Sequence, residues 1–168
     1  SSCSGLTSVV IGDGVTSIGE AAFSYCSGLK SVVIPDSVKL LFSGAFYGCK
    51  SLETVSIGKG LEDIQGSGAF EFCPALKNII VDSENEYFSN DSYGALYNKD
   101  KTVLIAYPSA SGDITISDGV TKIGWDAFAD CDNLISVVIP DSVTKIDEGA
   151  FGFCSNLESV TIGKGLSN

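Results

Sequence analysis

Apolar residues recur along this chain at a spacing of about 23 residues. Cysteines stand at positions 3, 26, 49, 73, 131 and 154. Each is followed by Leu after three residues, by Val or Ile after three more, and by Val or Ile again after two. An Ala-Phe pair precedes five of the six cysteines. A fixed period of 20–50 residues is typical of solenoids, in which stacked neighbours share one core.

Within one unit, the pattern predicts a strand, a turn and a short helical segment. Every second residue of Ser31–Ile34 is a candidate for burial, which is typical of a short strand with one buried face. The next residues are turn formers, either Pro35–Ser37 or, in another unit, Gly58–Gly60. Ala150 and Cys154 lie four residues apart, as on one side of a helical turn. The sequence therefore predicts an α/β solenoid with parallel strands on one side.

One unit is longer than the others, because 58 residues separate Cys73 from Cys131. It contains two apolar runs, 95–97 and 103–107, on either side of residues 98–101, and this pattern predicts a β-hairpin. Residues 11–63 and 116–168 also align with 31 identities over 53 positions, which indicates an internal duplication. We expect residues 1–168 to form one array, with a long variant repeat at about 82–113, and to be part of a longer array.

The Ala-Phe-x-x-Cys-x-x-Leu-x-x-Val-x-Ile stretches, with their Pro-Asp-Ser-Val or Gly-Lys-Gly-Leu turns, resemble the BspA-like class of leucine-rich repeats from Cys3 to Leu166. The resemblance implies a right-handed horseshoe, with short parallel strands on the concave face, short helical turns on the convex face and one β-hairpin extension. Members of this family are secreted or surface proteins, often of host-associated bacteria, and are associated with adhesion.

The composition excludes several classes of function. The net charge is −11, with a sequence pI near 4.2, which disfavours nucleic acids and anionic lipids as partners. No apolar run approaches the roughly 18 residues that cross a bilayer, so we expect no membrane insertion. The chain has no His, and its serines lack the setting of a catalytic nucleophile. We therefore predict no enzyme activity, catalytic residue, cofactor or metal ion.

The six cysteines have two interpretations. Their equivalent, inward positions favour a ladder of buried free thiols, whereas an even number in a protein of secreted type leaves structural disulfides open. The acidic residues between Asp82 and Asp91 predict a solvated loop rather than a calcium site, because the glycine and final glutamate of a calcium-binding loop are missing. The glycosylation sequon at Asn90 is best attributed to chance.

Two sets of residues are candidates for contact with a partner. The first follows the strand positions that face away from the core, where small, hydroxyl-bearing and β-branched side chains form two columns: Ser31, Thr54 and Ser136 in one, and Val33, Ser56, Val138 and Thr161 in the other. The second contains apolar residues at positions that are polar or small in other units: Trp125, Phe42 and Leu40. Sheet packing and local packing, respectively, are the alternative explanations.

The sequence thus predicts a non-catalytic protein–protein interaction or adhesion module of a cell-surface or secreted protein. It would bind a host, neighbouring-cell or matrix protein through the concave face, the hairpin or the irregular aromatic positions. The alternative is a structural or scaffold subunit that is held permanently within a larger intracellular or organellar assembly.

Overall fold

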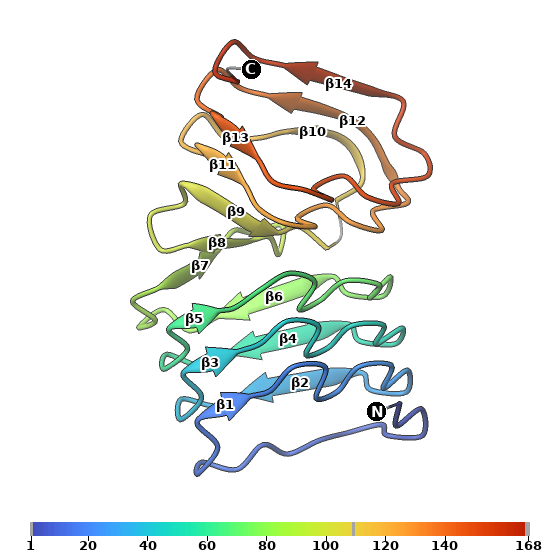
Figure 1. Cartoon of the computed structure of the whole chain (residues 1–168), viewed down its shortest axis with the longest axis vertical. Coiled ribbons are helices and arrows are strands. Elements are labelled where there is room, and N and C mark those ends of the chain that lie inside the picture. The colour runs from blue at the N-terminus through green and yellow to red at the C-terminus, as the bar shows by residue number, and fades with distance from the viewer. Residues whose placement is uncertain (1, 109, 167–168) are drawn as a thin grey trace.

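The protein is a column of stacked coils built from β-strands and turns (Figure 1). The computed structural model describes residues 2–108 and 110–166, and the two termini lie at opposite ends of the column. The strands in these residues are β1 (Ser17–Ile18), β2 (Ser31–Ile34), β3 (Leu40–Leu41), β4 (Thr54–Ile57), β5 (Asp63–Ile64), β6 (Asn78–Val81), β7 (Phe88–Asn90), β8 (Leu96–Asn98), β9 (Val103–Ala106), β10 (Gly112–Thr115), β11 (Lys122–Ile123), β12 (Leu134–Ile139), β13 (Lys145–Ile146) and β14 (Ser159–Ile162).

A regular inner coil contributes one long and one short strand, as with β2 and β3, and equivalent strands of neighbouring coils pair in parallel. The long strands form the sheets β2–β4–β6 and β10–β12–β14. The short strands form β1–β3–β5, and β9, β11 and β13 form the parallel part of a larger sheet. In β2, Val32 and Ile34 are buried while Ser31 and Val33 are exposed, so the predicted alternation is confirmed. The predicted horseshoe curvature and its handedness stay a prediction.

The segment between each short strand and the next cysteine consists of turns, and the prediction of short helical turns is wrong. No helix occurs in residues 2–108 or 110–166. In residues 19–26, alternate N–H groups donate within the coil, as from Ala22 to the Gly19 carbonyl. The N–H groups between them donate to the next coil, as from Phe23 to the Ala45 carbonyl at 2.8 Å. A helix keeps its backbone hydrogen bonds within itself, so this ladder between coils replaces it.

The backbone achieves this alternation with two left-handed residues in each turn segment. In the first of these segments they are Ala21 (φ 50°) and Tyr25 (φ 56°). The equivalent pairs in the other four are Gly44 and Gly48, Gly68 and Phe72, Asp126 and Asp130, and Gly149 and Phe153. Glycine adopts this conformation freely, whereas aromatic residues rarely do. The ladder between coils therefore holds several side chains in an unfavourable backbone conformation and presents them outwards.

The coils enclose two hydrophobic clusters, one in each half of the column. Aromatic rings of the turn segments contact one another within each cluster, with neighbouring ring centroids 5.0–5.9 Å apart. The rings are Phe23, Phe46 and Phe70 in the first cluster, and Tyr107, Phe128 and Phe151 in the second. Since both the strands and these rings repeat with the coil, each coil completes the core of its neighbour.

The long unit lies between the two clusters. Strand β8 pairs antiparallel with β7 and with β9, so the predicted hairpin is present and gains a third strand. Leu96 belongs to the first cluster, whereas Ala95 and Tyr97 belong to the second, and all three are buried. The expectation of a hairpin extension is therefore corrected: β8 is an internal layer, because successive residues of a strand point to opposite sides. We call the junction of the two halves the seam.

The two kinds of turn predicted from the sequence stack directly on one another. The Asp36 carboxylate accepts the Lys59 backbone N–H at 3.0 Å. A Cβ atom on Gly60 would lie 1.7 Å from the Asp36 carbonyl oxygen. Gly58–Gly60 is thus a turn in which glycine is needed for close backbone approach.

Candidate functional site

The outward side of the long strands is the first candidate binding surface, and we call it the long-strand face. Register pairs Val33 with Ser56 and Ser56 with Ile80, so that these residues form a column across three coils. The exposed fraction is 62% for Val33 and 50% for Ile80. A second column beside it contains Ser31, Thr54 and Asn78. The two columns predicted for this half are thus present. Thr54 and Ser56, in the middle strand, are half-buried and so less exposed than their neighbours in the columns.

The second half of the column repeats this arrangement. Val138 pairs with Thr115 on one side and with Thr161 on the other, and 40% of Val138 is exposed. The neighbouring column contains Ser136, whose hydroxyl donates to the Asp113 carboxylate at 2.6 Å. The sheet β2–β4–β6 is not hydrogen-bonded to β10–β12–β14. The long-strand face therefore consists of two separate sheets, one on each side of the seam.

The three irregular apolar residues do not form one surface. Leu40 lies in β3 and Phe42 directly follows it, and both are half-buried. Trp125 follows β11 in the other half and has 49% of its surface exposed. Trp125 lines a cavity of about 60 Å³ at the seam, which neither Leu40 nor Phe42 lines. Trp125 is the irregular residue that the structure places at an open site.

The seam cavity is formed by turn segments from both halves and by the end of β9. It is lined by Ile64, residues 66–71, residues 105–108, residues 125–127 and Ala129. Outside the cavity, the Asp130 carboxylate accepts the Phe72 backbone N–H at 2.8 Å and so joins the two halves. The cavity thus has aromatic, aliphatic and acidic walls.

Burial and neighbouring carboxylates raise the pKa values of three carboxyl groups at the seam. Burial raises the pKa of Glu71, and the nearby Asp126 and Asp130 raise it further. Burial also raises the pKa of Asp126, together with Glu148. The pKa of Asp130 is raised by burial, despite the Phe72 N–H that lowers it. The seam is therefore a region of concentrated negative charge.

A row of aromatic side chains, which the sequence analysis did not single out, runs along the outside of the turn segments. It consists of Tyr25, Tyr47, Phe72 and Phe153, and we call it the aromatic row. Neighbouring ring centroids are 5.3, 5.0 and 5.2 Å apart. The sequence contains a sign of this row: the residue before the repeated cysteine is aromatic in three units, whereas it is Gly or Asp in two others.

The cysteines are free thiols in the structure, and four of them are buried: Cys26, Cys49, Cys73 and Cys131. Cys3, in the first coil, is exposed and Cys154 is half-buried. The Cys49 thiol donates to the Phe23 carbonyl at 3.1 Å, and three other thiols make the equivalent contact with the preceding coil. Burial raises the pKa of Cys131 to about 12. The buried, protonated Cys131 thiol is therefore poorly suited to nucleophilic chemistry.

The acidic loop has structural roles. The Asp91 carboxylate accepts the N–H groups of Tyr93 and Ala95. The Asn90 side chain accepts the Val81 N–H at 2.9 Å. In the residues that the structure describes, no group of three or more His, Cys, Asp or Glu side chains is arranged to hold a metal ion. The same residues contain no helix long and apolar enough to cross a membrane.

Stacked coils with an in-register parallel ladder and a repeated leucine, which is buried in the four inner repeats (Leu29, Leu52, Leu76 and Leu134), define a leucine-rich-repeat solenoid. The family model of the BspA type leucine rich repeat region matches residues 1–104 and 107–168, in six copies. The chain therefore belongs to the BspA-type leucine-rich-repeat family. No curated protein matches it significantly.

Solved structures give the same fold. A leucine-rich cell-surface protein of Faecalibacterium prausnitzii is 35% identical, with a TM-score of 0.82 over 93% of this chain and 41% of that protein. The pneumococcal vaccine antigen PcpA is 23% identical, with a TM-score of 0.71 over 91% of this chain and 44% of that protein, and it supports the fold alone. A leucine-rich-repeat protein of T. pallidum is 26% identical, with a TM-score of 0.55, over 89% and 66% of the two chains. This chain spans about two fifths of the first two proteins.

Proposed function

We propose that this chain is a non-catalytic protein-binding module of a cell-surface or secreted protein, and that it binds through the long-strand face. The observation that carries the proposal is the set of exposed β-branched side chains on this face, above all Val33, Ile80 and Val138. A partner that covers them removes apolar surface from water, at about 25 cal/mol per Å². The hydroxyl groups of the neighbouring columns supply hydrogen bonds that orient the partner.

The support for this proposal comes from the rigidity of the face and from the relatives. Strands that pair in register across several coils lose little conformational entropy when a partner binds. A relative with 35% identity is described as a cell-surface protein. We infer a partner on a host cell, a neighbouring cell or the matrix. The net charge of −11 disfavours acidic partners.

The absence of His from the sequence supports a non-catalytic role, because the commonest general base is missing. Two buried thiols support it further: the hydrogen bond with Cys49 raises the pKa of Cys73 and burial raises the pKa of Cys131, so both stay protonated at neutral pH.

The test replaces apolar surface on the long-strand face with charge. The purified chain and the variant Val33→Asp/Ile80→Asp are compared for binding to an immobilised panel of purified matrix and cell-surface proteins. The control is Ser83→Asp/Ser117→Asp, which adds the same charge at two exposed positions outside these columns. Thermal unfolding of each variant verifies that it is folded.

The proposal predicts that a panel protein binds the wild type and the control alike, and that the Val33→Asp/Ile80→Asp variant binds it at least tenfold more weakly, since burying one unpaired charge costs more than 1.4 kcal/mol. Equal binding by both variants would assign the interaction to another surface. A panel of this breadth that bound nothing would contradict the adhesive role.

A further inference from the structure

The aromatic row is an exposed apolar surface whose side chains are not needed for the stacking of the coils, because equivalent positions carry Gly or Asp in other coils. Tyr25 and Phe153 have 52% and 69% of their surfaces exposed. Phe72 connects the halves, because its ring contacts both Tyr47 and Phe153. Phe72 and Phe153 adopt left-handed backbone conformations, which glycine adopts at equivalent positions without strain. The row follows the stack of coils, so an extended chain segment fits along it better than a compact surface does.

The aromatic row lies beside the seam cavity. Glu71, which lines the cavity, directly precedes Phe72 in the chain. Across the seam, Ala129 lines the cavity and directly precedes Asp130, whose carboxylate holds the Phe72 backbone. Trp125 lines the same cavity. An occupant of the cavity therefore lies next to the exposed rings.

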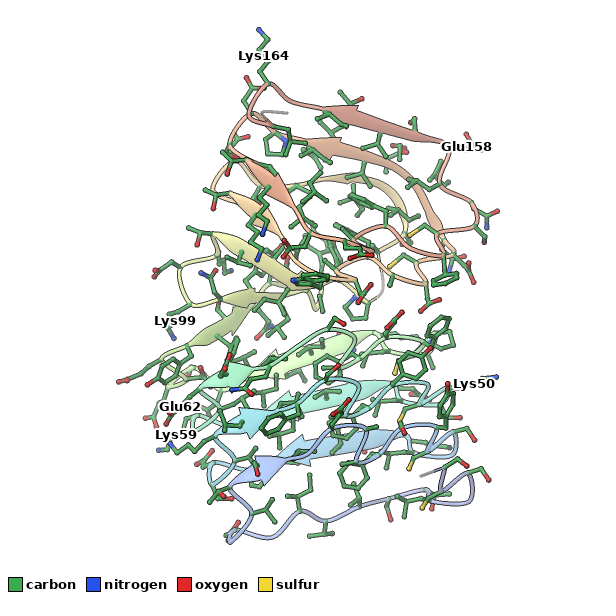
Figure 2. The ribbon with its side chains drawn as sticks, in the orientation of Figure 1. Lys50, Lys59, Glu62, Lys99, Glu158 and Lys164 are labelled. Atoms are coloured by element: carbon green, nitrogen blue, oxygen red, sulfur yellow. The ribbon has the colours of Figure 1, made fainter. Side chains whose placement is uncertain are left out.

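Charge determines which kind of segment fits. The side-chain charges that shift the pKa values of Glu71, Asp126 and Asp130 are all other carboxylates. Lysines form their ion pairs elsewhere, as Lys59 does with Glu84 at 2.8 Å. In Figure 2, Lys59 and Lys99 lie at the edge of the column opposite Lys50 and Glu158, and Lys50 projects away from the protein. The negative charge at the seam is therefore left for a cation from outside.

Cations and aromatic rings also attract one another directly. A Lys or Arg side chain over an aromatic face gains about 0.5–1 kcal/mol at an exposed site and more when it is desolvated. Carboxylates that line a partly enclosed cavity add a charge-assisted hydrogen bond to the same group. An acidic segment would meet repulsion from three carboxylates. A neutral segment would leave them without counter-charge.

We propose that the aromatic row and the seam cavity bind a basic, extended segment of a partner protein, with one Lys or Arg side chain in the cavity and its neighbours on the rings. The proposal rests on the protein-binding role proposed above, but it does not depend on the long-strand face. It assigns this chain a second surface and states the chemistry of the partner segment.

The test uses three synthetic peptides of about twelve residues with the same extended frame, namely repeats of Arg-Pro-Ser, Gln-Pro-Ser and Glu-Pro-Ser. Binding is followed by the fluorescence of Trp125, the only tryptophan in the chain, and is located by amide chemical shifts. The variants are Glu71→Gln/Asp126→Asn and Phe153→Ala. The control, Asp63→Asn/Glu86→Gln, removes the same charge from two exposed positions outside the cavity lining.

We expect the basic peptide alone to bind, with shifts around residues 70–72, 125–130 and 153. Each variant should weaken it about fivefold or more, because one cation–aromatic or charged contact is worth about 1 kcal/mol. The control should change binding less than twofold. Equal weakening by the control would reduce the effect to net charge, and shifts on the long-strand face would assign the peptide to the other surface. Each of these two results overturns the proposal. Equal binding of the Gln-Pro-Ser peptide, or no binding of the Arg-Pro-Ser peptide at millimolar concentration, overturns it as well. None of these results decides whether the long-strand face binds a partner, which the Val33→Asp/Ile80→Asp variant tests separately.

Discussion

Asn85 is the polar side chain on which the attachment of the long unit depends, and its removal is the most informative stability test. Its surface is fully buried. The side-chain N–H groups donate to the carbonyls of Gly58 and Leu61 at 3.0 and 3.1 Å. The side-chain oxygen accepts the N–H groups of Tyr87 and Phe88 at 2.8 and 2.7 Å. One side chain therefore ties the start of the hairpin to the turn of the preceding coil.

Asn85→Ala removes all four hydrogen bonds. The bonds to Leu61 and Phe88 are buried, so these two backbone groups are left unpaired at about 1–3 kcal/mol each. The bonds to Gly58 and Tyr87 are half-buried, and water replaces part of what they lose. We expect a loss of about 4 kcal/mol of unfolding free energy, a large share of the roughly 5–15 kcal/mol of a typical domain.

Urea denaturation at pH 7 measures this loss, and amide hydrogen exchange locates it. The amides of Tyr87 and Phe88 should lose protection first. The control is Asn156→Ala, which removes one exposed hydrogen bond to the Asp132 carbonyl and should cost less than about 0.5 kcal/mol. A loss below about 1 kcal/mol for Asn85→Ala would refute the reasoning, because water would then satisfy all four groups.

Asn85→Asp tests the donated hydrogen bonds alone, because it keeps the accepting oxygen and replaces the donating NH₂ group by a second oxygen. One oxygen still accepts the N–H groups of Tyr87 and Phe88, but the other now faces the carbonyls of Gly58 and Leu61. A buried carboxylate beside two carbonyl oxygens is unfavourable, so the protonated form is preferred and the pKa of this group rises. The variant should therefore be less stable than Asn85→Ala at pH 7 and regain stability as the pH falls.

Three further predictions concern charge and backbone packing. Because the pKa values of Glu71 and Asp126 are raised in the folded state, ionisation of these groups destabilises the fold. Thermal unfolding of Glu71→Gln/Asp126→Asn should therefore show a gain at pH 7 that shrinks as the pH falls through the raised folded-state pKa values and is lost by about pH 4. The two lysine ion pairs of Asp147 outweigh its burial and lower its pKa, so Asp147→Asn should lose about 1–2 kcal/mol at pH 7, and this difference should shrink as the pH falls through the folded-state pKa. Gly60→Ala should lower the urea midpoint strongly, because its Cβ would meet the Asp36 backbone, whereas Gly119→Ala, which has open space, should leave it nearly unchanged.

The periodicity predicted the strands well because burial alone determines them. Val32 and Ile34 are buried, and Val33 faces outwards between them, as a period of two requires. The outward columns followed from the same rule. Their binding role does not follow from it, since hydroxyl-bearing and β-branched residues also suit a closely stacked sheet without a partner.

The turn segments were mispredicted because their geometry depends on neighbouring coils. A separation of four residues, as between Ala150 and Cys154, suits a helical turn within one coil. In the structure, the turn segments that hydrogen-bond to the next coil have a left-handed residue before the Ala of each Ala-Phe pair and another before the Cys that follows the pair. Glycines at 44, 48, 68 and 149 were the available signal. Tyr25 and Phe72 concealed it, because residue type gives no reason to expect a left-handed conformation there.

The long unit shows how a structural irregularity and a candidate binding site arise together. Ala95, Leu96 and Tyr97 are consecutive apolar residues, and such a run is typical of a strand buried on both sides. Once β8 is placed between the two clusters, the ladders on either side are interrupted. Phe72 and Asp130 then bridge the turn segments, and the cavity with Trp125 lies between them. The interruption of the repeat is therefore where Trp125, Glu71 and Asp126 come to line one cavity.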